Sequence, residues 1–187
     1  PPVVVADLKA QLRVDTDAED TLMETYLRVA AEYLERITGI AILRRTYTQA
    51  FRNFCGDGSS IGPMQGTEVI LLRSPAISVE SIQYRATNGS EQTLGFESYF
   101  LTTSKPPRLC LRPGCAWPAT DNTPDSIRVN FTAGYSNADL PPELKQCILF
   151  VAGHFFENRT PFLQISGMCE VPLTLKAIID SLRVFYW

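Results

Sequence analysis

The sequence is most informative at Ser126-Ile127-Arg128-Val129-Asn130-Phe131-Thr132-Ala133 and, a few residues later, at Asp139-Leu140-Pro141-Pro142-Glu143. Apolar and polar residues alternate strictly in the first segment, which predicts a half-buried β-strand. The second segment predicts the start of a helix, because a proline in a first helical turn sacrifices no hydrogen bond. The chain is therefore expected to change from β to helical structure between these two segments.

Two helices are predicted downstream. In the first, two apolar stripes at helical spacing lie side by side, which indicates burial on more than one side, inside the chain or against a neighbouring subunit. These stripes are Leu144, Ile148, Val151 and Phe155, and Leu149, Ala152 and Phe156. The last helix is expected to begin near Pro172 and to use Leu175, Ile178, Ile179 and Leu182.

The N-terminal part is also predicted to be helical. A short helix covers residues 8–12, and Thr16 with Glu19 fits a capping box at the start of a second helix. Gly39 suits the position after the last turn, so this helix is expected to end near Thr38. Its apolar stripe is predicted at Leu22, Tyr26, Val29, Tyr33 and Ile37, widened by Leu27, Ala30 and Leu34.

Short strands are expected between the helical ends, at residues 43–51, 69–72, 79–84, 99–102, 108–111 and 126–133. Turn signals such as Asn88-Gly89 separate them, which favours a small antiparallel sheet or barrel. Residues 55–66 contain four glycines and are expected to form a long loop.

The predicted fold class is therefore α+β: a helical bundle from the N- and C-terminal helices with an inserted antiparallel β subdomain. Its parts are the N-terminal helical part, residues 1–41, the β-rich subdomain, residues 42–135, and the C-terminal helical part, residues 136–187, which packs with the first.

Composition and charge narrow the functional classes. The 187 residues are 45% hydrophobic and carry a net charge of −3, which argues against a dedicated nucleic-acid-binding domain. No run approaches the roughly 18 apolar residues that would cross a membrane. The net charges of the three parts are −4, +2 and −1. Two interpretations stay open: complementary surfaces between neighbouring subunits, or separately solvated surfaces.

The search for chemistry yields no catalytic, cofactor or metal site. Five scattered cysteines favour buried free thiols over a disulfide framework. The single histidine, His154, lies in an apolar helix and is expected to be mostly buried. Cys110 and Cys115 are at the edge of zinc-ligand spacing, but no second such pair exists. The sequence therefore predicts a protein without enzymatic activity, cofactor or metal.

The order of several short segments resembles the head–tail connector (adaptor) proteins of long-tailed bacteriophages and gene transfer agents. The first segments are Leu8-Lys9, Leu12-Arg13-Val14-Asp15, Tyr26-Leu27, Ala30-Ala31, Leu34-Glu35 and Thr38-Gly39. The later ones are Leu72-Arg73-Ser74-Pro75-Ala76-Ile77, Phe131-Thr132-Ala133-Gly134-Tyr135, Leu140-Pro141-Pro142-Glu143-Leu144-Lys145 and Phe156-Glu157-Asn158-Arg159. Residues 55–66 and 115–124 lie outside the resemblance.

The resemblance implies a structural role in a virion. Such adaptors are assembled in the host cytoplasm and form a homo-oligomeric ring, typically of twelve copies, at the head–tail junction. The ring bridges the portal protein to a stopper or tail-completion protein, and double-stranded DNA passes through it without sequence-specific contacts. The resemblance leaves open whether the isolated chain is a monomer, and it implies no contact with a membrane.

Two groups of residues are candidates for these contacts. The aromatic tail Phe185, Tyr186 and Trp187, with Arg183, is a candidate partner interface, because aromatic residues and arginine anchor interfaces; docking onto the chain's own core is the alternative. Arg44, Arg45 and Arg52 are candidate intersubunit or DNA-channel groups, with solvated strand-edge arginines as the alternative. Two other classes compete: a monomeric phage-related binding or accessory protein, and an enzyme in which Cys110, Cys115, Cys147 and His154 converge.

The role of the tail is testable by deletion. Removing residues 185–187 is expected to impair folding or attachment to the partner, because exposed aromatic residues at a free end must dock somewhere. The unfolding midpoint and binding to the partner should be measured on the same variant. An unchanged midpoint with lost attachment identifies an interface anchor, a lowered midpoint places the tail in the core, and no change in either contradicts both roles.

Overall fold

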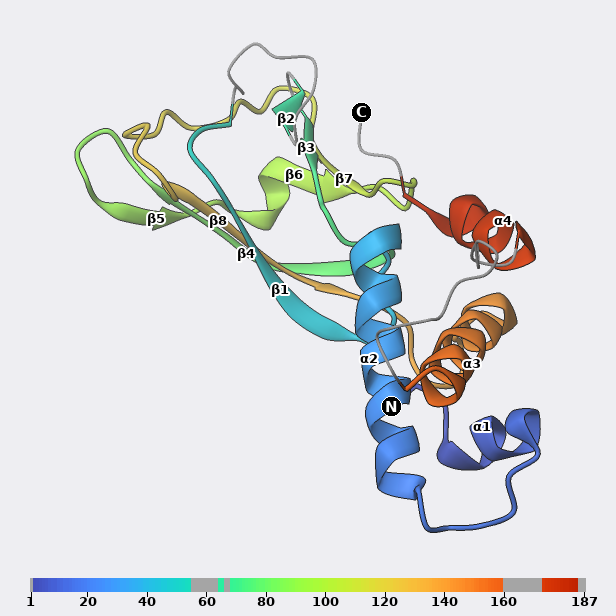
Figure 1. The fold of residues 1–187 in the computed structure, drawn as a ribbon. Helices are drawn as coiled ribbons and strands as arrows, with labels where there is room; N and C mark the ends of the chain where they lie inside the picture. Colours follow the sequence, from blue (N-terminus) through green and yellow to red (C-terminus); the bar gives the residue numbers. More distant parts are fainter. Residues whose placement is uncertain (1, 55–63, 66–67, 160–172, 185–187) are drawn as a thin grey trace. The chain divides into compact units, whose positions relative to one another are not determined.

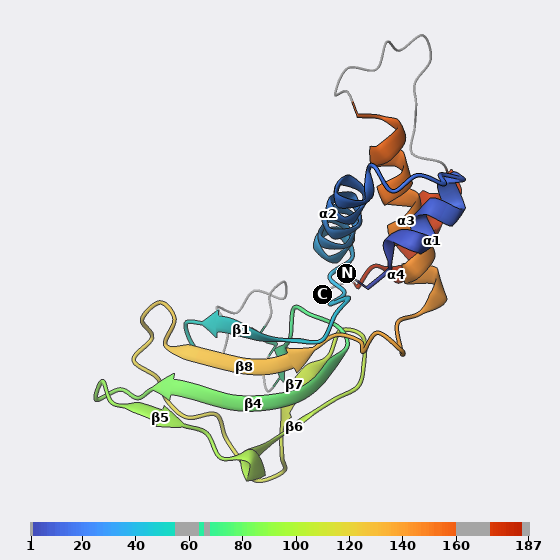
Figure 2. The same ribbon diagram turned by 90° about the horizontal axis from the view of Figure 1, so that it is seen from below.

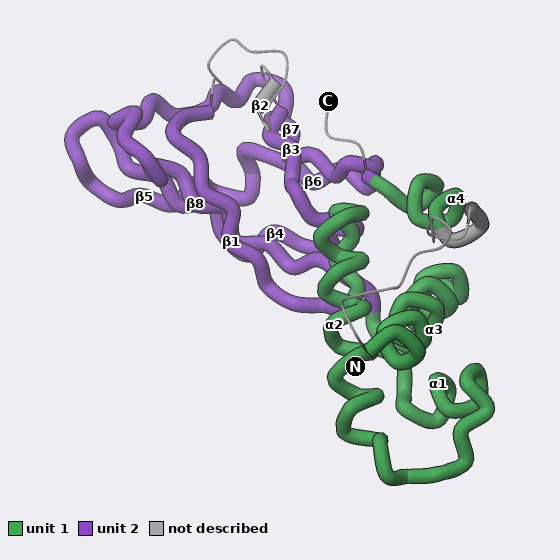
Figure 3. Tube along the Cα trace, viewed as in Figure 1, with its two compact units in different colours: residues 1–42, 136–183 green, residues 43–135, 184–187 purple. Residues whose placement is uncertain are grey.

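The computed structural model describes residues 2–54, 64–65, 68–159 and 173–184. It has helices and antiparallel sheets, so the predicted α+β fold class is confirmed. Two compact units divide the chain. The helical unit comprises residues 1–42 and 136–183, and the β unit comprises residues 43–135 and 184–187 (Figure 3). Most of the predicted loop at residues 55–66, and Pro172, lie outside the described residues.

The helical unit contains α1 (Val5–Leu12), α2 (Asp20–Thr38), α3 (Pro142–Glu157) and α4 (Leu173–Leu182). Helix α3 packs against all three others (Figure 1). As predicted, α2 ends at Thr38: Gly39 has φ 75° and donates its N–H to the Glu35 carbonyl. The buried apolar residues described in this unit are Val3, Leu8, Met23, Leu27, Ala30, Leu34, Ile40, Ala41, Ile42, Leu140, Leu144, Cys147, Ile148, Val151, Ala152 and Ile179.

The apolar stripe of α2 is not centred where the spacing predicted. Met23, Leu27 and Leu34 are fully buried, whereas Val29 and Tyr33 keep 44% and 45% of their surface exposed. The helix has more apolar residues than one packed face can bury, and α3 covers the side that contains Met23 and Leu27. Part of the predicted stripe therefore lies on the surface of this unit.

The predicted capping box at Thr16 and Glu19 is wrong. The Thr16 hydroxyl accepts a hydrogen bond from the Ala18 N–H at 3.2 Å, and the Glu19 side chain caps nothing. The Glu19 carboxylate instead accepts two hydrogen bonds from the Arg159 guanidinium, at 2.6 and 2.8 Å. The guanidinium of Arg159, which follows α3 in the sequence, binds a carboxylate more strongly than a backbone N–H does. The tertiary contact therefore replaces the local capping motif.

The β unit has two four-stranded antiparallel sheets. One has the order β1 (Arg45–Phe51), β8 (Ile127–Ala133), β4 (Ala76–Arg85), β5 (Glu91–Thr93), and Figure 2 shows β8 between β1 and β4. The other has the order β2 (Met64–Gln65), β3 (Glu68–Ile70), β7 (Arg108–Leu111), β6 (Tyr99–Leu101). The six predicted strands are present, β7 with the predicted bounds and the other five with shifted ends. Strands β2 and β5 were not predicted, since each is too short for alternation to be visible.

The core of the β unit lies on the inner face of β8, as the alternation predicted. Ile127, Val129, Phe131 and Ala133 are all buried, and their neighbours on the strand face outward. The Gln49 side chain joins the two sheets: its amide donates to the Ile70 carbonyl at 3.0 Å and accepts from the Leu72 N–H at 2.9 Å.

The chain enters and leaves the β unit at one place. Leu43 and Tyr135 form a parallel bridge, and the Arg44 N–H donates to the Tyr135 carbonyl at 3.0 Å. Gly134, with φ 113°, fits between them, since a Cβ there would lie 2.3 Å from the Leu43 carbonyl oxygen. No side chain can be placed at residue 134 without moving one of the two backbone segments.

Replacing this glycine is expected to destabilise the protein strongly. Gly89→Ala is the matched control, because Gly89 also has a positive φ (82°) but a Cβ there would meet nothing within 4 Å. The control should cost about 1–2 kcal/mol for the left-handed conformation alone. Gly134→Ala should cost about 1–3 kcal/mol more, because of the backbone clash. Equal free energies of unfolding for the two variants, measured with denaturant, would contradict this role.

Candidate assembly site

The predicted arginines lie at the start and end of β1 and are all exposed. Arg45 packs over the Tyr47 ring, with its guanidinium carbon 5.0 Å from the ring centroid, and its Nε–H donates to the Tyr47 hydroxyl at 2.6 Å. Arg52 follows the last residue of β1, seven positions further along the chain. The structure therefore places Arg44 and Arg45 together and Arg52 at the other end of the strand.

Arg73 was missed by the sequence reasoning. It lies in the connection between β3 and β4, and its guanidinium carbon is 5.7 Å from the Tyr47 ring centroid. Two arginines thus flank one tyrosine, which in turn stacks on Phe131 at 5.9 Å. No local pattern predicts this cluster, because residues 45 and 73 become neighbours only when β1 and β4 pair with β8.

Among the predicted tail residues, Arg183 is described and Phe185, Tyr186 and Trp187 lie outside the described residues. Arg183 follows α4, is exposed, and donates from its Nε to the Ile37 carbonyl at the end of α2 at 3.2 Å. This hydrogen bond joins two helices of the same unit. Arg183 therefore has a structural contact within the chain, and its role as a partner contact stays a prediction.

The three described thiols, of Cys110, Cys115 and Cys147, and the histidine do not form a poised chemical group. Cys147 is fully buried, and burial, followed by the charge of Glu143, raises the pKa of its thiol. Burial and then the Glu68 carboxylate raise the pKa of the Cys110 thiol. Both shifts disfavour the nucleophilic thiolate. Cys115 is exposed. In the part of the chain that the structure describes, no three His, Cys, Asp or Glu side chains are placed to hold a metal ion.

The prediction of a mostly buried His154 is wrong. Its side chain is exposed on α3, and its Nδ1 lies 3.2 Å from the Asn158 amide nitrogen. The histidine lies on a side of α3 that the other described helices leave exposed, which its apolar neighbours in the sequence do not reveal. Phe150, on the same side, keeps 44% of its surface exposed.

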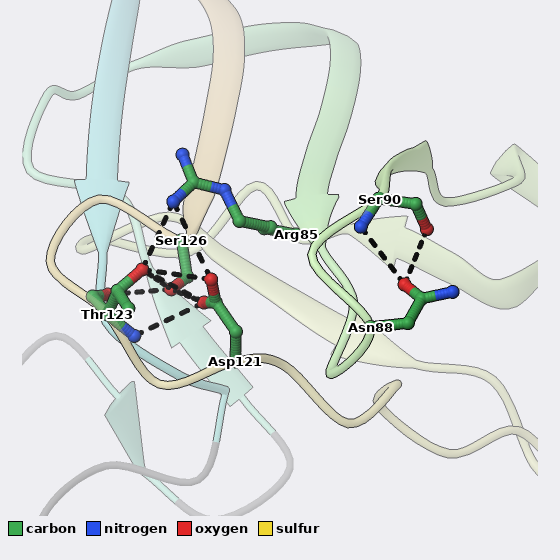
Figure 4. A network of polar contacts seen from close by, with 6 residues as sticks. All are labelled: Arg85, Asn88, Ser90, Asp121, Thr123 and Ser126. Atoms are coloured by element: carbon green, nitrogen blue, oxygen red, sulfur yellow. Dashed lines mark hydrogen bonds and ion pairs between the residues drawn. The ribbon is translucent and has the colours of Figure 1, made fainter.

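A polar network fixes the loop before β8 (Figure 4). The Asp121 carboxylate accepts hydrogen bonds from the Ser126 hydroxyl and the Thr123 N–H and lies 3.6 Å from the Arg85 guanidinium. These hydrogen bonds, the one from Ser126 first, hold the pKa of Asp121 below its usual range. In the same loop Trp117 stacks on Phe54, with ring centroids 4.6 Å apart. These contacts stabilise the loop before β8.

The described part of the chain presents exposed apolar residues and clustered arginines. Its helices include none that is long and apolar enough to cross a membrane, within the described residues. Exposed large apolar residues lie on both units, among them Val29, Tyr33, Leu72 and Phe150. Such residues, together with clustered arginines, are typical of protein interfaces.

Comparison with known protein families gives one match: residues 3–89 match the model described as phage gp6-like head–tail connector protein. Comparison with curated protein sequences gave no match. The match indicates the class of head–tail connector proteins for that part of the chain.

Solved structures similar to this chain come from gene transfer agent (GTA) particles. A chain in the virion of a native GTA particle is 22% identical, with a TM-score of 0.75, over 98% of this chain and 90% of that one. A chain in the neck of an empty GTA particle, computed with C6 symmetry, is 25% identical with a TM-score of 0.73, over 98% and 90%. One in the neck of a native particle, computed with C12 symmetry, is 22% identical with a TM-score of 0.69, over 97% and 88%. The resemblance to head–tail connectors inferred from the sequence is confirmed over residues 3–89, which are 87 of the 187 residues.

The chemical state of the cysteines is testable by native thiol labelling. Of the three described cysteines, Cys115 should react fastest at pH 7, because it is exposed, whereas burial and raised pKa values slow Cys110 and Cys147. The labelled positions should be mapped by mass spectrometry, with denatured protein as the control in which all of them react. Fast native labelling of Cys110 or Cys147 would contradict this account and reopen the interpretation as a thiol enzyme.

Proposed function

We propose that this protein is a structural head–tail adaptor of a phage or phage-like particle, located at the head–tail junction. It forms a ring below the portal protein, joins the capsid to a stopper or tail-completion protein, and lets double-stranded DNA pass. The observation that carries this function is the connector-family match over residues 3–89, in a chain whose fold follows GTA virion and neck proteins along nearly its whole length.

A closed ring of about twelve copies is the assembly that the neck structures support best. C12 is the symmetry of a ring of twelve equivalent copies, and such a ring also has C6 symmetry. Each copy in such a ring contacts its neighbours head to tail, so it must carry two unlike surfaces. The exposed apolar residues of the helical unit and the arginine cluster of the β unit provide unlike surfaces of this kind.

Contacts to the portal and to the stopper are assigned to surfaces outside the ring contact. Arg183 and the tail residues Phe185, Tyr186 and Trp187 are the proposed partner interface, because aromatic residues and arginine dominate interface energies. Arg52 is a proposed DNA-channel group, since it lies at the opposite end of β1 from Arg44 and Arg45.

DNA must slide through the ring, which requires weak contacts. Every lysine or arginine held against a phosphate adds to salt-dependent affinity and slows sliding. The outer face of the β1–β8–β4 sheet is polar and mostly uncharged: Asn130 accepts from Thr48 and donates to Ser81, at 2.6 and 3.0 Å. A net charge of −3 for the whole chain is compatible with the same requirement. No catalytic step belongs to this function.

The function is tested by electron microscopy of the protein mixed with its portal, because an adaptor that is monomeric alone can assemble on that template. A ring of this chain at the outer end of the portal is the expected result. The control is the same mixture without portal. Absence of a ring both from the mixture and from isolated particles would overturn the proposal and favour a monomeric accessory protein.

A further inference from the structure

The two units carry opposite net charges. The helical unit has eight basic and thirteen acidic side chains, a net charge of −5, and the β unit has nine basic and seven acidic, a net charge of +2. A head-to-tail contact that sets the helical unit of one copy against the β unit of the next would therefore be attractive. Contacts between like units would be repulsive.

The acidic α3 face is one local surface with this character. It consists of Glu143, Phe150, His154 and Glu157, all exposed. Glu143, Phe150 and Glu157 follow one another at intervals of seven residues, which is close to two helical turns, so they lie along one side of α3. An aromatic ring with 44% of its surface exposed thus has a carboxylate two turns away on either side.

The basic patch is the matching surface on the β unit. It consists of Arg44, Arg45, Tyr47, Leu72 and Arg73. Two guanidiniums flank the Tyr47 ring at 5.0 and 5.7 Å, and Leu72, 41% exposed, is held beside β1 by the hydrogen bond from its N–H to Gln49. A guanidinium has five N–H donors, so an arginine that already holds one partner can still bind a carboxylate in a fork.

A second exposed apolar surface of the helical unit, on α2, fits the basic patch less well. Val29 and Tyr33 are as exposed as Phe150, but the charged side chains beside them have both signs: Arg28 and Arg36 are basic, and Glu32 is acidic. A surface of mixed charge attracts a basic patch less than one whose charged side chains are carboxylates. Because of this difference in charge, we expect α3 and not α2 to face the basic patch.

We propose that the acidic α3 face of one copy docks on the basic patch of the next copy, and that this is the repeating contact of the ring. The occupant of the α3 face is thus a second copy of this chain. Phe150 packs against the apolar surface of Tyr47 and Leu72, while Glu143 and Glu157 pair with Arg44, Arg45 and Arg73. The inference rests on the proposed function, since it specifies how the copies of the adaptor meet.

Charge reversal tests the pairing in particles produced with all their other components. Glu143→Lys with Glu157→Lys, or Arg44→Glu with Arg45→Glu, should each reduce the fraction of particles with a neck ring about tenfold or more, because like charges then face each other. Combining all four substitutions should restore that fraction to within about twofold of the wild type, since the attraction returns with its sign reversed. Rings are counted by electron microscopy, and copies of the chain per particle by mass spectrometry.

Matched controls separate the contact from general effects of charge and hydrophobicity. Glu32→Lys with Asp180→Lys makes the same change in net charge at exposed positions of the helical unit that lie off the α3 face, and should leave the rings intact. Phe150→Gln should reduce ring formation, whereas Tyr33→Gln, at an equally exposed aromatic residue, should not. The unfolding midpoint of each purified variant shows whether a loss of rings is caused by misfolding. If a charge-reversed pair misfolds, ring formation by the variant with all four substitutions still tests the pairing.

Three outcomes would overturn the inference while leaving the adaptor function standing. The first is a normal ring in both charge-reversed pairs. The second is a fourfold variant as defective as its worse parent. The third is a normal ring with reduced DNA delivery in the Arg44→Glu, Arg45→Glu variant, which would assign these arginines to the channel. Failure of the proposed function itself has a different signature, because wild-type particles would then contain no ring of this chain.

Discussion

The rest of the structure depends on the close approach of two backbone segments, at Leu43 and at Gly134–Tyr135. The chain leaves α2, builds the whole β unit and returns to begin α3, so the entry and exit strands must lie side by side. A glycine with a positive φ is what allows this, because any side chain at residue 134 would collide with the Leu43 carbonyl. With this junction closed, residues 20–38 and 142–157 can pack as α2 and α3 although about a hundred residues separate them.

Each unit is completed by polar contacts that join distant parts of the chain. In the helical unit the fork between Glu19 and Arg159 ties the start of α2 to the end of α3, and the bond from Arg159 lowers the pKa of the Glu19 carboxyl. In the β unit Gln49 bridges the two sheets, and Asp121 organises the loop before β8. These groups satisfy one another inside the fold. Among the surfaces that stay exposed in the described residues are an aromatic side of α3 and a cluster of arginines, which are typical of protein interfaces.

Much of the fold could be predicted because it rests on local patterns. Strict alternation located β8 and its buried face, and Gly39 located the end of α2. The candidate site was less accessible. Arg44 and Arg45 could be named from the sequence, but Arg73 could not, because strand pairing alone brings it to Tyr47. His154 was expected to be mostly buried, since helical spacing reveals how many apolar faces a helix has but not which of them another element will cover.

The sequence by itself therefore determined the α+β class, most of the strands, the ends of the long helices and the resemblance to head–tail connectors. All of these depend on residues close together along the chain, or on the order of short segments. Only the tertiary structure decided which apolar residues stay on the surface, where the Glu19 carboxylate finds its partner, and how Arg45 and Arg73 come to share one tyrosine. The physical reason is that these contacts join residues far apart in the sequence, and their energies exist only after the units have closed.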